Sequence, residues 1–321
     1  MRAIRFERPG GPEVLERADV PEPEPRAGEI RVRNRAIGVN FIDTYHRSGL
    51  YKVELPSGLG VEGAGEVDMV GPSVASFAVG DRVAYVSRTP GSYAEATCVE
   101  ASGAVKLPPE IAFPTAAAMM LKGLTVELLL RRLHIQPQPG EPILWHAAAG
   151  GVGTIACQWA KARGLQLIGT AGGKDKCELA RQAGATHVID YKKEDVVARV
   201  RELTEGRGVR IVYDSVGKDT WERSLECLQP FGLMVSFGNA SGPVPPVSLL
   251  SLSAKSLYVT RPVMWTYVAR YGAEMMASLL EVVKSGKIKI EIGRSLALAD
   301  AEEAHRALEA RETTGSVVLV P

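Results

Sequence analysis

The sequence is poor in cysteine and in net charge, and each shortage excludes a class of protein. Four cysteines among 321 residues lie far apart and form no CxxC pair. This spacing is typical of reduced, mostly buried thiols in a cytosol and not of a disulfide scaffold. A formal net charge of +1 excludes a bulk electrostatic attraction to nucleic acid or anionic membranes. No basic patch interleaved with aromatic residues is present either, so nucleic-acid binding is not expected.

Long hydrophobic runs are also missing. No stretch approaches the roughly 18 consecutive apolar residues of a membrane span. The opening residues, MRAIRFERPGGPEVLE, lack the apolar core of a secretory signal. We therefore expect a cytoplasmic protein without a membrane segment. Hydrophobic residues make up 45% of the chain and charged residues 23%, as in a soluble globular protein with a sizeable core.

The pattern of strands and helices changes along the chain. Short alternating runs separated by Gly and Pro, such as 29–40 and 65–71, predict strands in the first third. A helix is predicted over 115–133. Strands then alternate with helices up to residue 260, which predicts a doubly wound parallel sheet. The expected strands are 142–147, 165–171, 187–191, 209–217, 232–240 and 256–260, and the expected helices are 150–164, 174–184, 193–206 and 220–228.

The last part of the chain is predicted to add two helices and two strands. We therefore expect an α/β protein in which the parallel sheet is inserted into a β-rich domain made from both chain ends. The predicted division assigns residues 1–123 and 263–321 to the β-rich domain and residues 124–262 to the α/β domain. The expected C-terminal elements are a helix over 265–285, a strand over 286–292, a helix over 299–310 and a strand over 316–321.

A glycine-rich turn follows the first strand of the alternating region. In HAAAGGVGTIACQWAK, Gly150 and Gly153 hold the second and third places of the dinucleotide fingerprint G-x-G-x-x-G, and Ala148 holds the first. Small residues also occur where a helix packs closely on a strand, but a strand before the turn and a helix after it favour phosphate binding. Gly150 lets a pyrophosphate approach the backbone, and Gly153 lets the helix approach the strand. Ala148 is small enough for the tight turn.

The end of the next strand indicates which dinucleotide binds. An NAD site usually places Asp or Glu about 20 residues further on, where it accepts from the ribose 2′-OH. In IGTAGGKDK, residues 168–176, the strand end has no acid. Lys174 and Lys176 suit a 2′-phosphate, although Asp175 lies between them and such lysines are equally typical of a solvated helix surface. Tyr191 is a further candidate beside the adenine, and the sequence favours NADPH over NADH.

With these features the chain resembles the medium-chain dehydrogenase/reductases, and within them the zinc-free quinone oxidoreductases related to zeta-crystallin, closest to the bacterial enzymes. The segments GVNFIDTYHRSGLY, LPSGLGVEGAGEVDMVG, LKGLTVELLLRR and WHAAAGGVGTIACQWAKARG carry the likeness. It covers essentially the whole chain and is more specific for the branch than for the substrate. The resemblance implies a GroES-like domain, a Rossmann domain, and NADPH-dependent reduction of a quinone in the cleft between them.

The residues at the metal positions of this superfamily imply an enzyme without zinc. Zinc-dependent relatives carry a Cys where this chain has Asn40 and a His where it has Val61. The lobe that binds structural zinc with four cysteines is absent, because only Cys98 lies in that region. Without zinc, alcohol oxidation by Lewis-acid polarisation is not expected. The histidines have no metal-type spacing and are expected at the surface or in packing: His46, His134, His146, His187 and His305.

The resemblance places candidate catalytic residues beside the nicotinamide ribose. A quinone is already electrophilic, so positioning by the cofactor site is the main requirement. Tyr45 is the best candidate to hydrogen-bond the acceptor oxygen and donate a proton, and it is equally well a half-buried packing residue. Asn40 is alternatively a turn residue, and Asp43 alternatively orients Tyr45 or a ribose hydroxyl. Candidates for an apolar wall of the pocket, or for ordinary packing, are Phe41, Leu50 and Tyr51.

Other cofactor contacts are expected at the carboxyl ends of the strands, where such folds bind ligands. After the last strand, Arg261 and its neighbours are expected to present backbone to the carboxamide, and Gly315 is expected to help close the site. The predicted cofactor-binding set comprises Asn40, Asp43, Tyr45, Lys122, Thr125, Ala149, Gly150, Gly151, Val152, Gly169, Thr170, Gly172, Gly173, Lys176, Tyr191, Ser215, Phe237, Gly238, Asn239, Pro262, Val263 and Ser316.

Two alternatives to quinone reduction remain open. An NADPH-dependent enone or alkenal reductase would use the same hydride donor and the same fold. Relatives recruited as a lens protein or as binders of AU-rich RNA make a structural or RNA-binding role a rival from another class.

A homodimer is expected because SLYVT, residues 256–260, would form an exposed apolar edge strand, and this branch resembles dimers built that way.

Overall fold

Strands from both ends of the chain share one sheet, which forms the core of the first of two structural units. The computed structural model describes all residues, 1–321. The first unit comprises residues 1–124, 268–284 and 290–321, and the second comprises 125–267 and 285–289. The strand order in the shared sheet is β15-β16-β3-β5-β6-β8, and β7 also pairs with β3. These strands are β3 (Glu29–Val39), β5 (Glu62–Val70), β6 (Arg82–Val86), β7 (Ala96–Glu100), β8 (Ala104–Lys106), β15 (Ile292–Ala297) and β16 (Ser316–Val320).

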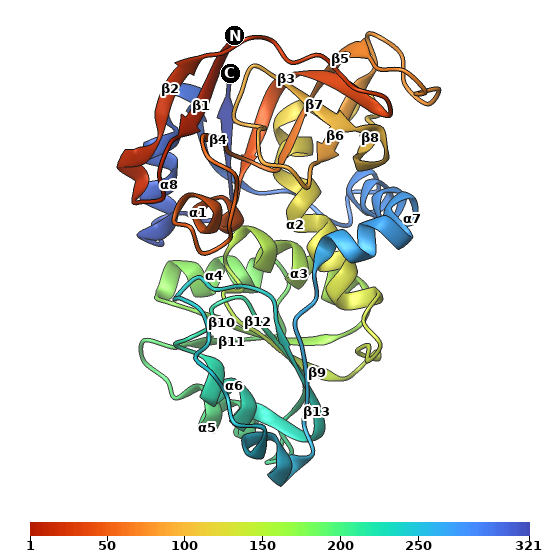
Figure 1. Ribbon diagram of the computed structural model, residues 1–321. Coiled ribbons are helices and arrows are strands. Elements are labelled where there is room, and N and C mark those ends of the chain that lie inside the picture. Colours follow the sequence, from red (N-terminus) through yellow and green to blue (C-terminus); the bar gives the residue numbers. More distant parts are fainter. The chain divides into compact units, whose positions relative to one another are not determined.

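A smaller sheet and two helices complete the core of this unit. Strand β1 (Arg2–Phe6) pairs with β2 (Glu16–Asp19) and β4 (Ser57–Gly58). Helix α8 (Ala301–Glu309) contacts α1 (Phe41–Arg47), although about 260 positions separate them in sequence (Figure 1). Ala301 and Ala304 of α8 belong to one buried apolar cluster with Phe6, Leu59 and Leu319. The short 3₁₀ helices of the unit are η1 (Pro12–Val14), η2 (Ala101–Gly103) and η4 (Leu298–Asp300).

The second unit is built on a parallel sheet of six strands in the order β11-β10-β9-β12-β13-β14. The central strands are short runs of buried apolar residues, as expected for strands covered on both faces. The α/β prediction with a doubly wound sheet is confirmed, and β14 lies at the sheet edge as predicted. The strands are β9 (Pro142–Trp145), β10 (Gln166–Ala171), β11 (His187–Asp190), β12 (Val209–Asp214), β13 (Leu228–Ser236) and β14 (Tyr258–Thr260).

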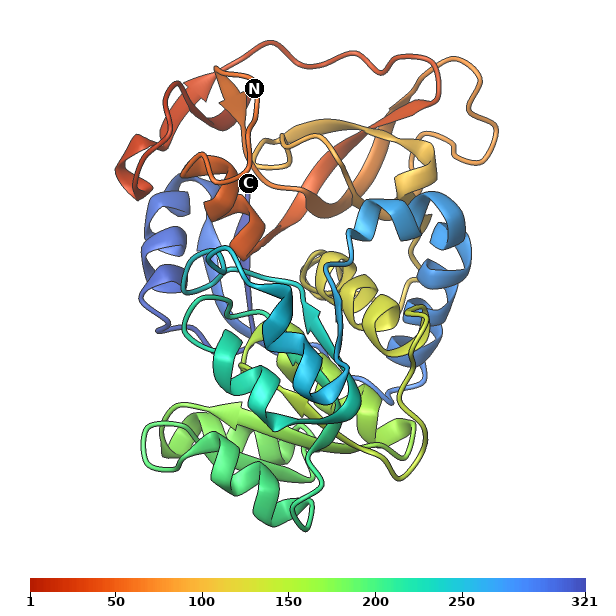
Figure 2. The same ribbon diagram turned by 60° about the horizontal axis from the view of Figure 1, so that its bottom comes forward.

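Four helices connect these strands, and a second view shows them beside the sheet (Figure 2). Helix α3 contacts α4, and α5 contacts α6. Leu144, Val200 and Val212 belong to one apolar core cluster formed by strands and helices of this unit. The elements are α3 (Gly151–Ala162), α4 (Lys174–Gln182), α5 (Val196–Leu203), α6 (Trp221–Cys227) and the 3₁₀ helix η3 (Leu249–Lys255).

Two long helices contain the points at which the chain passes between the units. Residues up to Leu124 of α2 (Phe113–Arg131) belong to the first unit, and most of α7 (Met264–Lys284) also belongs to it. By length and composition alone α2 is apolar enough to cross a membrane, although Lys122 and Glu127 interrupt its apolar residues. However, 72% of its tested stretch is buried within the protein, as in the core helix of a globular domain.

The structure differs from the sequence prediction in one strand, in the division of the chain and in one additional helix. The strand expected over 286–292 is absent, and a strand begins only at Ile292. At Lys289 the Gln158 side chain donates to the backbone carbonyl and accepts from the backbone amide. These backbone groups are therefore bonded to a side chain and not to a neighbouring strand. Residues 263–267 and 285–289, predicted to belong to the β-rich domain, lie in the second unit. Helix α1 was not predicted.

Candidate active site

The glycine turn lies at the carboxyl edge of the parallel sheet, between β9 and α3. Gly150 is the N-cap of α3, and no side chain caps the first turn. A Cβ on Gly153 would lie 2.3 Å from the carbonyl oxygen of Ala147, so only glycine permits this close approach of helix and strand. The uncapped amides and the helix dipole fit a pyrophosphate.

The strained residue of this turn is Ala147, which precedes the Ala148 of the fingerprint. Ala147 has φ of +56°, a left-handed conformation that costs an L-residue about 1 kcal/mol. Ala148 is fully buried, and its Cβ occupies the space that a Cβ on Gly169 would need, 2.6 Å away. Gly169, predicted as a cofactor contact, therefore serves the packing of the turn on the next strand.

The region expected to distinguish NADPH from NADH contains one residue that sequence reasoning missed. The Asp190 carboxylate accepts from the amides of Gly173 and Lys192, at 2.9 and 3.1 Å. These backbone hydrogen bonds lower the pKa of Asp190, so it is an anion at the start of α4. The sequence feature that could have identified Asp190 is an acidic residue at the end of the third predicted strand, in HVIDY. The hydroxyl of Tyr191 would lie 2.5 Å from a Cβ on Gly172, which brings these two predicted residues together.

The two predicted lysines lie on the first turn of α4. Lys174 is exposed and Lys176 is half-buried, and Asp175 is exposed between them. Gly173 has φ of +96° and N-caps the helix without a side-chain cap. Backbone amides and two ammonium groups therefore surround this helix start, a donor set that suits a phosphate.

The ends of β12 and β13 approach each other through glycine. A Cβ on Gly238 would lie 2.4 Å from the carbonyl oxygen of Ser215, and one on Gly217 would lie 2.6 Å from that of Gly242. Gly217 also has φ of +92°. The predicted residues Ser215, Phe237, Gly238 and Asn239 are thus gathered at one sheet edge, in agreement with the rule for ligand sites in such folds.

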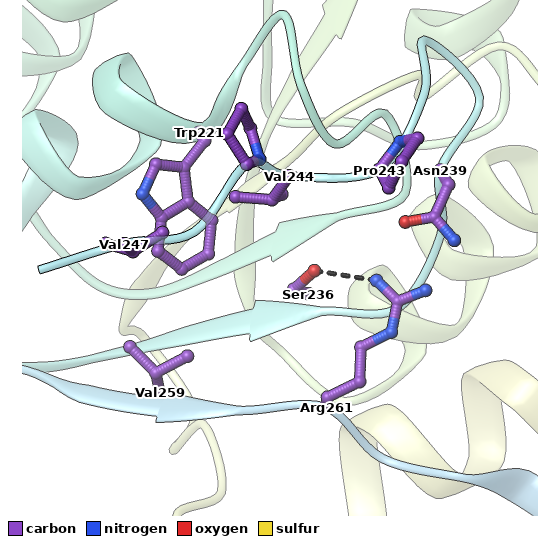
Figure 3. Close-up of a pocket in the computed structure, with 9 residues that line it drawn as sticks. Trp221, Ser236, Asn239, Pro243, Val244, Val247, Val259 and Arg261 are labelled. Atoms are coloured by element: carbon purple, nitrogen blue, oxygen red, sulfur yellow. Dashed lines mark hydrogen bonds between the residues drawn. The ribbon is translucent and has the colours of Figure 1, made fainter.

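A pocket of about 350 Å³ opens beside β13 and β14 (Figure 3). The Arg261 guanidinium donates to Ser236 Oγ at 2.8 Å and to the carbonyl oxygen of Gly238 at 3.1 Å. The Arg261 side chain therefore connects the end of β14 to the end of β13. The lining is mostly apolar: Trp221, Ser236, Asn239, Pro243, Val244, Pro245, Val247, Val259 and Arg261.

In the first unit, a buried ion pair lies beside the candidate catalytic residues. Glu62 is fully buried and accepts from Asn40 Nδ2 at 2.7 Å, Lys122 Nζ at 3.2 Å and the amide of Leu121 at 2.6 Å. Lys122 also donates to the carbonyl oxygen of Val39. Two of the three ammonium protons of this predicted cofactor residue are therefore used inside the unit. Glu62 was not predicted.

A second buried chain of hydrogen bonds ends on Asp43. Its Oδ2 accepts from the amide of Asn40 at 2.8 Å and from Tyr93 OH at 3.1 Å. Tyr93 OH lies 3.2 Å from His305 Nε2, and Arg47 Nη1 lies 2.9 Å from His305 Nδ1. Asp43 therefore has Tyr93 as a partner, which the sequence did not predict. Tyr93, His305 and Arg47 were missed because they lie far apart in sequence.

Tyr45 lies in an aromatic group on α1. Its ring centroid is 5.3 Å from that of Tyr51 and 6.4 Å from that of Phe41. Tyr45 is 9% exposed and Leu50 is 40% exposed. The structure thus brings Phe41 and Tyr51, two of the three residues expected to form an apolar wall, beside Tyr45.

A pH dependence of stability is expected from Asp43. Burial, the largest effect, raises its pKa to about 7 from the usual 3.8. Between these values the folded protein keeps a proton that the unfolded chain has released, so the free energy of unfolding falls as pH rises, by roughly 4 kcal/mol at most. In Asp43→Asn, the amide oxygen can accept both existing hydrogen bonds. Denaturant titrations from pH 4.5 to 8 should show this decline in wild type relative to the variant, and parallel profiles would contradict it.

The remaining predicted residues are distributed between the two units. Ser316, in the first unit, is buried and donates to the carbonyl oxygen of Ala118. Thr170, in the second unit, is buried and bonds His146. His134 and His187 are exposed, as expected, while His46, His146 and His305 are buried. Asn40 is the N-cap of α1, and Val61 is fully buried. No group of three or more His, Cys, Asp and Glu side chains is arranged to hold a metal ion.

Comparisons with known protein families match both units. The family described as "Alcohol dehydrogenase GroES-like domain" matches residues 26–109, and the family described as "Zinc-binding dehydrogenase" matches residues 151–284. A quinone oxidoreductase of Pseudomonas aeruginosa is 56% identical, with 100% of this chain and 99% of that protein covered.

Similarity to solved structures is equally extensive. The structure of Escherichia coli quinone oxidoreductase complexed with NADPH is similar with a TM-score of 0.97 and 50% identity, and 100% of each chain is covered. A more distant relative is the 2-haloacrylate reductase of a Burkholderia species, 39% identical over 99% of this chain and 98% of that protein.

Proposed function

Because the chain belongs to the quinone oxidoreductases of the medium-chain dehydrogenase/reductase superfamily, we propose that this oxidoreductase reduces quinones with NADPH. The observation that carries the proposal is the glycine turn at the start of α3, whose uncapped amides and close helix approach suit a dinucleotide. The presence of NADPH in the similar E. coli structure supports the same cofactor here.

The residues of the second unit would hold NADPH in a fixed orientation. Gly151 and Val152 would offer amides to the pyrophosphate, since the Gly150 amide already donates to the carbonyl oxygen of Ala147, and Lys174 and Lys176 would bind the 2′-phosphate. Ser215 and Asn239, at the ends of β12 and β13, would contact the nicotinamide half. When bound, NADPH supplies the hydride, so the protein contributes mainly orientation and exclusion of water.

On the acceptor side, Tyr45 is proposed to hydrogen-bond the quinone oxygen. Reduction adds one hydride and one proton, and a phenol is able to donate to the developing oxyanion. Asn40 and Asp43 are proposed to position α1 through their buried hydrogen bonds. With Asn40 and Val61 at the metal positions, zinc independence is part of the proposal. The cleft between the domains as the acceptor site, and a cytoplasmic location, stay predictions from the sequence.

A second candidate function is reduction of a conjugated carbon–carbon double bond. The 39% identity to a 2-haloacrylate reductase favours it, since hydride addition to an activated alkene needs the same donor.

One assay separates the two candidate functions. NADPH oxidation should be followed with a panel of benzoquinones and naphthoquinones and, in parallel, with 2-haloacrylate and simple enones. Quinone reduction with little enone turnover is expected. Turnover of enones without turnover of any quinone would replace the first function by the second.

The protein is proposed to form a homodimer through β14. On β14, Tyr258 and Val259 are 53% and 42% exposed, and on the preceding η3, Leu249 and Leu250 are 81% and 80% exposed. These exposed apolar side chains favour pairing with a second copy.

Introducing charged residues at this edge is expected to dissociate the dimer into monomers. Leu249→Glu combined with Leu250→Glu should shift the sedimenting species from twice 34.4 kDa to 34.4 kDa, because both charges would be buried in the interface. Val79→Glu, at an apolar residue of the first unit that is 68% exposed, is the control and should remain dimeric. A wild type that sediments as a monomer at micromolar concentrations would contradict the dimer.

A further inference from the structure

We infer that His146 is a positioning residue for the dinucleotide turn, an inference that rests on the proposed NADPH binding. His146 was expected to be a surface or packing histidine. It is 2% exposed, which agrees with a packing role, and it lies directly before the strained residue Ala147. Its two ring nitrogens bond side chains from two other elements of the second unit, so it connects the turn to the rest of the sheet edge.

The ring belongs to a continuous chain of four side chains. His146 Nδ1 lies 3.0 Å from Thr170 Oγ1, and His146 Nε2 lies 3.0 Å from Ser224 Oγ. Ser224 Oγ donates to Asp214 Oδ2 at 2.9 Å. All four residues are at least nine-tenths buried. Every ring and hydroxyl position in the chain therefore has a partner within the protein.

The direction of each hydrogen bond follows from the carboxylate at one end. Because Ser224 donates its only proton to Asp214, it must accept from His146 Nε2–H. Burial lowers the pKa of His146, so the ring is neutral and Nδ1 is left as an acceptor for the hydroxyl of Thr170. One tautomer alone satisfies all four groups, which fixes the orientation of the ring.

The carboxylate end of the chain fixes the loop after β12. Asp214 accepts from the amides of Val216 at 2.7 Å and Gly217 at 3.0 Å, and from Thr220 Oγ1 at 2.7 Å. These bonds hold the segment that follows Ser215, a predicted nicotinamide contact. The chain thus links the carboxyl ends of β9, β10 and β12 with α6.

This linkage bears on binding because three of the predicted cofactor segments share it. The turn at Ala147 is in a conformation that its own residue disfavours, and backbone bonds from His146 to Tyr213 and from Ala148 to Thr170 hold it on both sides. Without the ring, Thr170 and Ser224 would lose buried partners and the strand ends could shift apart. A shift of the turn weakens binding of the pyrophosphate more than it slows a subsequent hydride step.

Direct titration of NADPH by fluorescence tests the inference without an activity assay. His146→Leu removes both hydrogen bonds, and the Kd for NADPH is expected to rise about tenfold or more. His146→Gln presents one acceptor and one donor as the neutral ring does, and it should restore most of the affinity. Ser224→Ala breaks the same chain at another point and should weaken binding as well. At saturating NADPH, kcat with a quinone should stay within about twofold of wild type.

Two controls separate positioning from general destabilisation. Val200→Ala removes core volume on α5, away from the sheet edge, and should lower stability without changing the Kd. His187→Leu replaces an exposed histidine at the start of β11 and should change neither the stability nor the Kd for NADPH. If His146→Leu and Ser224→Ala both bind NADPH as tightly as wild type, the inference is overturned while the proposed function stands. If wild type itself fails to bind NADPH, the proposed function and this inference both fail.

Discussion

Replacing Glu62 by alanine is expected to lower the free energy of unfolding by about 3–5 kcal/mol, the usual cost of removing one partner of a buried ion pair. Glu62 is fully buried and the Lys122 side chain is 8% exposed. The substitution would leave the ammonium without a counter-ion and would also remove the acceptor of Asn40 Nδ2 and of the Leu121 amide. Chemical denaturation of the purified variant measures the effect.

A neighbour on the same strand provides the matched control. Glu66 pairs with Arg35 at 2.8 Å, but both side chains are exposed, at 40% and 55%. Glu66→Ala should therefore cost less than about 1 kcal/mol. Replacing both members of the buried pair, Glu62→Gln with Lys122→Met, should recover much of the loss because no uncompensated charge remains. If Glu62→Ala were as mild as Glu66→Ala, the described environment of Glu62 would be wrong.

Removing both lysines of α4 is expected to abolish the preference for NADPH. Each charge-assisted hydrogen bond to a phosphate contributes about 1.5–3 kcal/mol. Lys176→Ala should therefore lower kcat/KM for NADPH at least about tenfold, and the double variant with Lys174→Ala should lower it further. The value for NADH, which has no 2′-phosphate, should change little. Steady-state kinetics with both nucleotides and one quinone measure the preference.

Arg181→Ala is the control for the lysine variants. Arg181 carries the same charge on the last turn of the same helix, and its side chain is 52% exposed. It should leave the nucleotide preference unchanged. Should the preference survive in both lysine variants, the 2′-phosphate would have to bind elsewhere, and Asp190 beside Gly173 would become the residue to explain.

Much of the parallel sheet could be predicted because its signals are local. Apolar strand runs, helix patterns and the glycines at 150 and 153 each depend on neighbouring residues, and the structure has the strands and the turn in the predicted order. The strand expected over 286–292 fails for a non-local reason. A side chain more than 100 positions earlier, Gln158, takes the hydrogen bonds of Lys289.

The buried polar groups around the candidate site could not be predicted for the same reason. Asp43 meets Tyr93 at a separation of 50 residues and Tyr93 meets His305 at 212. A pattern of one residue type gives no sign of such partners. Asp43 and His146 were each noticed in the sequence, but their contacts are set by the fold. The contact between Asp214 and Ser224, which lies on the next helix, is likewise set by the fold.

We propose that this chain catalyses the oxidation of NADPH by a quinone without a bound metal. The most direct measurement is the rate of NADPH and NADH oxidation by one benzoquinone, on protein dialysed exhaustively against a chelator. Quinone-dependent oxidation should be unchanged by dialysis and at least about tenfold more efficient with NADPH. This proposal fails if there is no quinone-dependent oxidation with either nucleotide, or if the activity is lost on dialysis and recovered with zinc.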